Sequence, residues 1–178
     1  MAFASDEDFR RWLRDLEISY ERLFYGTDWK PWLAEKLPGY DVLQPTMPNK
    51  SNAKYPEWSI YFSKIVTFLR PGAVLIGHSL GAIFLAKYLS EHPPVQKFSK
   101  VILVAAPYND EATEPLGDFK LASAKGLADA TEEIHLFYSR DDPVVSFDEM
   151  SKYQRDLPAA KSHIFDGRGH FNTPDFPE

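Results

Sequence analysis

The segment GHSLG, residues 77–81, has the spacing Gly-x-Ser-x-Gly and lies between an apolar run and a stretch rich in Ala and Leu. A serine on a tight turn from strand to helix presents its hydroxyl at the end of a sheet, and glycine on either side allows the backbone a close approach. This setting favours Ser79 as a nucleophile. The alternative is a Gly-rich turn whose serine only caps the helix, or an anion site at the helix N-terminus.

A nucleophilic serine requires a base and an acid that orients the base. Where the serine lies on a tight strand-to-helix turn of this kind, called a nucleophile elbow, the three residues follow along the chain in the order Ser, then Asp or Glu, then His. The segment YSRDDPVV, residues 138–145, places Asp141 and Asp142 directly after an apolar run. We choose Asp142 as the acid because it directly precedes the Pro-Val-Val that packs back into the fold. Asp141 remains the alternative, and Asp166 is better explained as a residue that shapes a turn.

The sequence contains five histidines, and one of them fits the base. His170 lies in a Gly-rich loop after the last apolar run, where a base that moves between acid and nucleophile is best placed. His78 is the neighbour of Ser79, and its side chain is expected to project elsewhere. His92 ends a helix, where a cation suits the helix dipole. His135 and His163 lie within predicted strands as packing or surface residues.

Acyl transfer through a serine also requires donors for the oxyanion of the tetrahedral intermediate. The backbone N–H of Leu80 lies at the start of the predicted helix and is our first candidate donor. The second donor normally comes from a loop after an early strand. The sequence contains no such strand and loop, and Gly26-Thr27 is too weak a substitute.

Apolar runs alternate with helical patterns along the chain, which predicts a mostly parallel, doubly wound α/β sheet with helices on both faces. The runs at 73–76 and 101–105 are continuous enough for strands that are buried on both faces. We expect one domain over residues 1–178. The predicted strands are residues 40–43, 73–76, 101–105, 134–138 and 163–165, and the predicted helices begin near Ser5, Trp29, Pro56, Ala82 and Ser146.

Composition narrows the classes of protein. The chain has 178 residues and a net charge of −6, without a basic stripe, which argues against nucleic acid and anionic membranes as partners. The absence of cysteine removes disulfides, thiol nucleophiles and Cys-based zinc sites, and it suits a cytoplasmic location. We expect no metal and no cofactor.

Several segments together carry a resemblance to a known family: WL at 32–33, MPNK at 47–50, VLIGHSLGAIFLAKYLSEH, VILVAAPY, YSRDDPVV and GRGHF. In this combination the chain resembles the small serine hydrolases of the YdeN and retinoblastoma-binding-protein-nine type, over nearly its whole length. The resemblance implies Ser79 as nucleophile, Asp142 as acid and His170 as base. It also implies a compact α/β-hydrolase fold without a large cap domain or a metal.

Relative to the family pattern, the chain starts past a first apolar strand with a His-Gly-Gly-like loop and stops where a last helix is expected. We therefore expect a fragment or an N-terminally truncated form.

The activity implied is that of a serine hydrolase cleaving small carboxylic esters, or amides, through an acyl-enzyme on Ser79. Two alternatives remain: an idle hydrolase-like protein that binds a protein partner, and an acyltransferase with the same triad.

Overall fold

A parallel four-stranded sheet with the order β1-β2-β3-β4 forms the centre of the fold, so the expected α/β class is confirmed. The computed structural model describes residues 1–178 except 17–28, 111 and 178. Within these residues the elements are α1 (Asp6–Asp15), α2 (Trp29–Lys36), α3 (Tyr55–Val66), β1 (Val74–His78), α4 (Leu80–Glu91), β2 (Phe98–Val104), the 3₁₀ turn η2 (Gly117–Phe119), α5 (Leu127–Ala130), β3 (Thr131–Ser139), α6 (Glu149–Asp156) and β4 (Lys161–Phe165).

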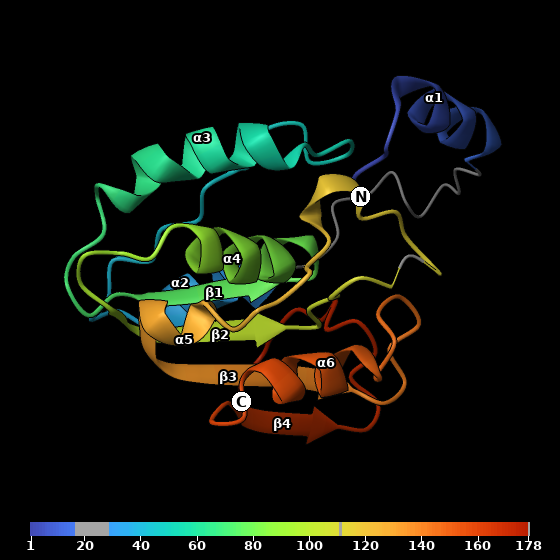
Figure 1. Cartoon of the computed structure of the whole chain (residues 1–178). Helices are drawn as coiled ribbons and strands as arrows, with labels where there is room; N and C mark the ends of the chain where they lie inside the picture. Colours follow the sequence, from blue (N-terminus) through green and yellow to red (C-terminus); the bar gives the residue numbers. More distant parts are fainter. Residues whose placement is uncertain (17–28, 111, 178) are drawn as a thin grey trace.

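Helices lie on both faces of the sheet (Figure 1). Helices α4, α5 and α6 cover the face toward the viewer, because successive parallel strands in sequential order are joined by right-handed crossovers on one side. Helix α2 lies behind β1, where the Trp29 ring contacts the His78 ring edge-on, with centroids 6.2 Å apart. Helix α1 projects from the rest of the molecule and contains no buried residue.

The main core lies between the sheet, α4 and α3. Helix α4 has seven buried residues, which explains why its sequence is apolar on most of its circumference. The Phe84 ring lies 5.4 Å from the Trp58 ring and 5.3 Å from the Phe62 ring, both edge-on. Such aromatic packing fixes α3 across the outer side of α4, and α4 in turn fixes the residue that precedes it, Ser79.

Most predicted helices begin where the sequence indicates. A helix was predicted to begin near Ser5, and Ser5 is the N-cap of α1: its hydroxyl oxygen accepts a hydrogen bond from the Asp8 amide at 3.1 Å. Helix α3 carries Pro56 in its first turn, where the missing amide hydrogen has no intrahelical partner to lose.

Some predictions from the sequence were wrong. Residues 40–43 form no strand: Tyr40 is 72% exposed and Leu43 55% exposed, and an isolated extended segment has no neighbour to bond. Strand β1 is not buried on both faces, because Val74 and Ile76 are 44% and 38% exposed while Leu75 between them is buried. The helical spacing of apolar residues from Trp58 to Leu69 predicts one long apolar face, but α3 ends at Val66 and its Tyr61 is 39% exposed.

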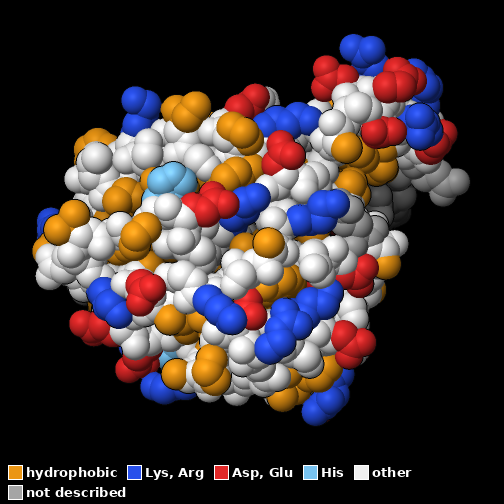
Figure 2. Space-filling model, in the orientation of Figure 1, with side chains coloured by type: hydrophobic (Ala, Val, Ile, Leu, Met, Phe, Trp, Pro, Cys, Tyr) orange, Lys and Arg blue, Asp and Glu red, His pale blue; other side chains and the backbone are white. Residues whose placement is uncertain are grey.

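The surface shows no large area of one charge on the side that carries α4 and α6. Acidic and basic side chains are interspersed there (Figure 2). Across the described residues, none of the helices has the length and apolar character needed to cross a bilayer.

Candidate active site

Ser79 occupies a strained turn between β1 and α4. Its backbone has φ 53° and ψ −122°, a conformation that a residue with a side chain rarely adopts. The Ser79 amide donates a hydrogen bond of 2.9 Å to the carbonyl of Val104 at the end of β2. The turn is therefore held by the neighbouring strand.

The two glycines of the elbow differ in what they permit. A Cβ built on Gly77 would lie 2.6 Å from the Cα of Ala82 and 2.6 Å from the carbonyl oxygen of Gly81, so only glycine fits there. At Gly81 a Cβ would meet nothing within 4 Å beyond the backbone of its own helix. The expectation that both glycines clear the backbone is thus supported at Gly77 alone.

The structure brings His170 and Asp142 together, although 28 residues separate them. The Nδ1 of His170 lies 2.8 Å from one carboxylate oxygen of Asp142 and 3.1 Å from the other. Both side chains are nearly buried, at 9% and 3% exposed. A carboxylate can only accept, so Nδ1 carries the hydrogen, and in the neutral ring Nε2 holds the free electron pair of a base.

The Asp142 carboxylate is fixed by backbone amides that follow it in the chain. Its Oδ1 accepts hydrogen bonds from the amides of Val144 at 2.8 Å and Val145 at 3.0 Å. Asp141 faces the loop of residues 167–169 and makes no contact with the His170 ring among the hydrogen bonds of the described residues. The geometry therefore favours Asp142 as the partner of His170.

His78, the last residue of β1 and the neighbour of Ser79, links the Ser79 turn to His170. The Nε2 of His78 donates a hydrogen bond of 2.8 Å to the backbone carbonyl of His170, and the two rings have centroids 4.9 Å apart. The described residues include no hydrogen bond from the Ser79 hydroxyl to the His170 ring.

The remaining histidines lie elsewhere. His92 ends α4, where its Nδ1 lies 3.1 Å from the Tyr88 carbonyl. His135 and His163 pair with each other on adjacent strands, with nitrogen atoms 3.0 Å apart. Burial in this pair lowers the pKa of His163.

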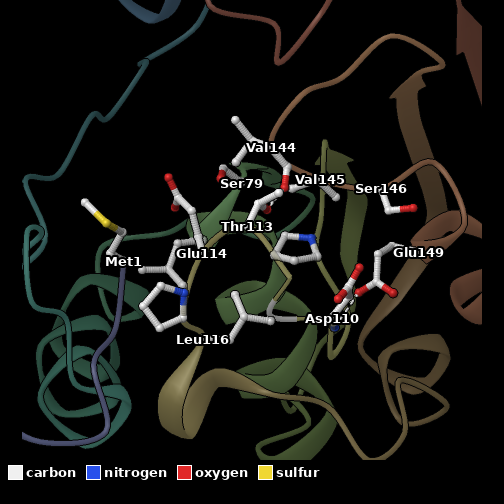
Figure 3. Close-up of a pocket in the computed structure, with 13 residues that line it drawn as sticks. Met1, Ser79, Asp110, Thr113, Glu114, Leu116, Val144, Val145, Ser146 and Glu149 are labelled. Atoms are coloured by element: carbon white, nitrogen blue, oxygen red, sulfur yellow. Dashed lines mark hydrogen bonds between the residues drawn. The ribbon is translucent and has the colours of Figure 1, made fainter. Parts of the chain in front are cut away.

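A pocket opens beside Ser79 (Figure 3). Its walls come from the elbow, from the segment after β2 and from the segment after β3. The lining residues are Met1, Ser79, Leu80, Pro107, Asp110, Thr113, Glu114, Pro115, Leu116, Val144, Val145, Ser146 and Glu149. The side chain of Thr113 donates to the carbonyl of Val144, so two of these walls are bonded to each other.

Comparison with known proteins identifies the family. The model of the family described as serine hydrolase matches residues 25–175. The chain belongs to the serine hydrolase family. It is 28% identical over 156 residues to the serine hydrolase RBBP9 of Rattus norvegicus, an alignment that covers 84% of this chain and 81% of that protein.

Solved structures agree on the fold of this serine hydrolase family member. The ydeN gene product of B. subtilis has a TM-score of 0.78 at 21% identity, covering 86% of this chain and 88% of that one. A meta-cleavage product hydrolase of Pseudomonas fluorescens has a TM-score of 0.56 at 12% identity, covering 71% and 68%. The expected α/β-hydrolase fold is confirmed.

Sequence reasoning missed one residue near the site of this serine hydrolase family member. In the sequence, Ser146 followed three residues later by Glu149 predicts a helix cap, yet α6 has no side-chain cap and Glu149 is 1% exposed. Its carboxylate accepts from the amides of Tyr108 at 2.6 Å, Asn109 at 2.9 Å and Asp110 at 3.0 Å. Glu149 therefore anchors the wall of the pocket that follows β2.

Leu80, predicted as an oxyanion donor, is the first residue of α4, so its N–H has no acceptor within the helix, and Leu80 is among the residues that line the pocket beside Ser79. Gly26-Thr27, the weak candidate for the second donor, lies outside the described residues.

Proposed function

We propose that this serine hydrolase family member cleaves small carboxylic esters, and more slowly amides, through an acyl-enzyme on Ser79, with His170 as base and Asp142 as acid. The observation that carries the proposal is the 2.8 Å contact between His170 Nδ1 and the buried Asp142 carboxylate. It is made at the sheet end where the strained backbone of Ser79 turns into α4.

The arrangement supports a two-step acyl transfer to water. His170 Nε2 takes the proton of the Ser79 hydroxyl as the oxygen attacks the substrate carbonyl carbon. The Leu80 amide donates to the oxygen that becomes negative, and Asp142 stabilises the imidazolium. The leaving alcohol departs with the proton from His170, and water then releases the acid from Ser79 by the same sequence of proton transfers.

The pocket favours a small acyl group. Its walls combine apolar side chains, Leu116, Val144 and Val145, with the carboxylates of Asp110 and Glu114. An uncharged short acyl chain can contact the apolar side chains without bringing a second negative charge close to the carboxylates. We propose small-molecule esters as the partners of this site.

A fluorophosphonate probe tests the nucleophile. We expect covalent labelling of the wild-type protein, and its complete loss in Ser79→Ala. His170→Ala should abolish labelling and turnover, whereas the matched variant His163→Ala should keep both within about threefold. Equal losses in the two histidine variants would mean that the base is misassigned.

The acid is tested in the same way by two neighbouring residues. Asp142→Asn should lower kcat on the order of a hundred-fold or more, because the imidazolium loses its charged partner. Asp141→Asn should cost far less. A folded wild-type protein that neither reacts with the probe nor hydrolyses short esters would refute the proposal and leave a protein that binds a partner. Transfer of the acyl group to added alcohols in preference to water would instead indicate an acyltransferase.

A further inference from the structure

The loop that carries His170 is bound along its backbone by side chains at the end of β3. Asp141 Oδ1 accepts hydrogen bonds from the amides of Gly167 at 3.0 Å and Gly169 at 3.1 Å. The Ser139 hydroxyl donates to the same oxygen at 2.5 Å and accepts from the amide between them, that of Arg168, at 3.1 Å. Three successive amides of the loop are therefore held by two side chains.

This loop needs such an anchor because its own conformational preferences are weak. Gly167 has φ 87° and Gly169 has φ 51°, so two positions adopt the left-handed region that glycine enters freely and also leaves freely. A segment with two such glycines has many accessible conformers, and the hydrogen bonds to Asp141 select one of them. The hydroxyl of Ser139 and the amides of Gly169 and Gly167 hold the pKa of the Asp141 carboxyl below its usual range, as expected of a carboxylate that accepts these bonds.

A second contact reaches the loop from the opposite side. The ring nitrogen Nε2 of His78 donates to the carbonyl of His170, at 2.8 Å. His78 precedes Ser79, so this bond ties the elbow directly to the residue proposed as the base. Asp141 thus fixes the start of the loop against β3, and His78 fixes its end against β1.

We propose that Asp141 is a positioning residue for His170, acting through the loop amides, with His78 as the second anchor. The inference rests on the proposed function, in which His170 is the base. Among the hydrogen bonds of the described residues, the His170 ring bonds Asp142 and none joins it to Asp141. Asp141 sets the place of the ring, and the acid role belongs to its neighbour Asp142.

Three variants test the role of Asp141. Asp141→Ala removes the acceptor for both glycine amides and should lower kcat about a hundred-fold while KM changes less than threefold, because a base displaced by about 1 Å loses the chemical step first. Asp141→Asn keeps an oxygen that can accept the same bonds and should stay within about fivefold of wild type. The matched control is Asp166→Ala, which removes a carboxylate from the same loop; that carboxylate is 84% exposed and pairs with Arg140.

Two results would overturn the proposal: a wild-type kcat in Asp141→Ala, or an equal loss in the Ala and Asn variants. If Asp141→Ala does not fold, Ser139→Ala tests a smaller part of the same anchor, since it removes the acceptor for the Arg168 amide and the hydroxyl that donates to Asp141. We expect a kcat about tenfold lower for Ser139→Ala, and an unchanged kcat would again contradict the proposal.

Amide hydrogen exchange separates this inference from the proposed function. The Gly167 and Gly169 amides should exchange at least tenfold faster in Asp141→Ala than in wild type or Asp166→Ala, whether or not the protein is an active hydrolase. Faster exchange in a protein without activity would refute the proposed function and keep the anchor. Unchanged exchange would refute the anchor, whatever the activity.

Discussion

Glu149 offers a quantitative test of how the pocket is held. Its buried carboxylate accepts three backbone amides of residues 108–110 and pairs with Lys152. Burial pushes the pKa of Glu149 upward, but the Lys152 ammonium and the three amides outweigh burial, so the pKa lies below its usual value of 4.5. A glutamine at this position keeps one oxygen acceptor and loses the charge.

The expected cost of Glu149→Gln follows from these bonds. A hydrogen bond to a charged group is worth about 1 kcal/mol more than one between neutral groups, so three amides give a loss of about 3 kcal/mol at pH 7. For a chain of this size that loss lowers the melting temperature by roughly 6–12 °C. Urea unfolding followed by tryptophan fluorescence measures the change in the free energy of unfolding. The control is Asp148→Asn, at an exposed neighbouring position.

The stability difference between wild type and Glu149→Gln should also depend on pH, in a direction set by the pKa of Glu149. Because the pKa of Glu149 is depressed in the folded protein, its contribution is fully present above the unfolded value of 4.5 and is lost as the pH falls through the folded pKa. The stability difference between wild type and Glu149→Gln should therefore shrink below pH 4.5. A Glu149→Gln variant as stable as Asp148→Asn at pH 7 would refute the anchoring role.

Three further outcomes are expected. Gly77→Ala should fail to label with a fluorophosphonate or fail to fold, because its Cβ would lie 2.6 Å from the Cα of Ala82, whereas Gly39→Ala, with open space around it, should behave as wild type in both assays. The pKa of His163 lies below its unfolded value of 6.5, so wild-type stability should fall as the pH drops below 6.5, and urea midpoints at pH 7.5 and 5.5 should differ less in His163→Gln. Glu114 lines the pocket, so Glu114→Gln removes a negative charge and should raise kcat/KM about fivefold for an aryl ester that has a carboxylate on its acyl chain. The value for the corresponding acetate ester should not change, and a rise for both esters would show that charge is not the cause.

The sequence predicted those parts of the site that depend on local pattern. The Gly-x-Ser-x-Gly pattern indicates the turn at Ser79. Apolar runs predict the two strands after which Asp142 and His170 lie, so the sequence alone predicts the order of the three residues. The prediction of a strand at residues 40–43 was wrong because a strand forms only where another strand bonds to it. The sequence of one segment does not show whether such a partner lies beside it. Glu149 was missed likewise, because its amide partners lie 39–41 residues earlier.

The two adjacent aspartates show where residue type stops being informative. Asp141 and Asp142 have the same chemistry and follow the same strand, yet one bonds the His170 ring and the other bonds the loop amides. The alignment of the strands decides between them: the register joins His78, Val104, Phe137 and His163 across the sheet, so the segments that follow each strand meet at one edge. At that edge Asp142 turns inward, held by the amides of residues 144 and 145, and Asp141 is left facing the loop after β4. Two adjacent aspartates thus hold His170 in two ways, Asp142 through its ring and Asp141 through the backbone of the loop that carries it.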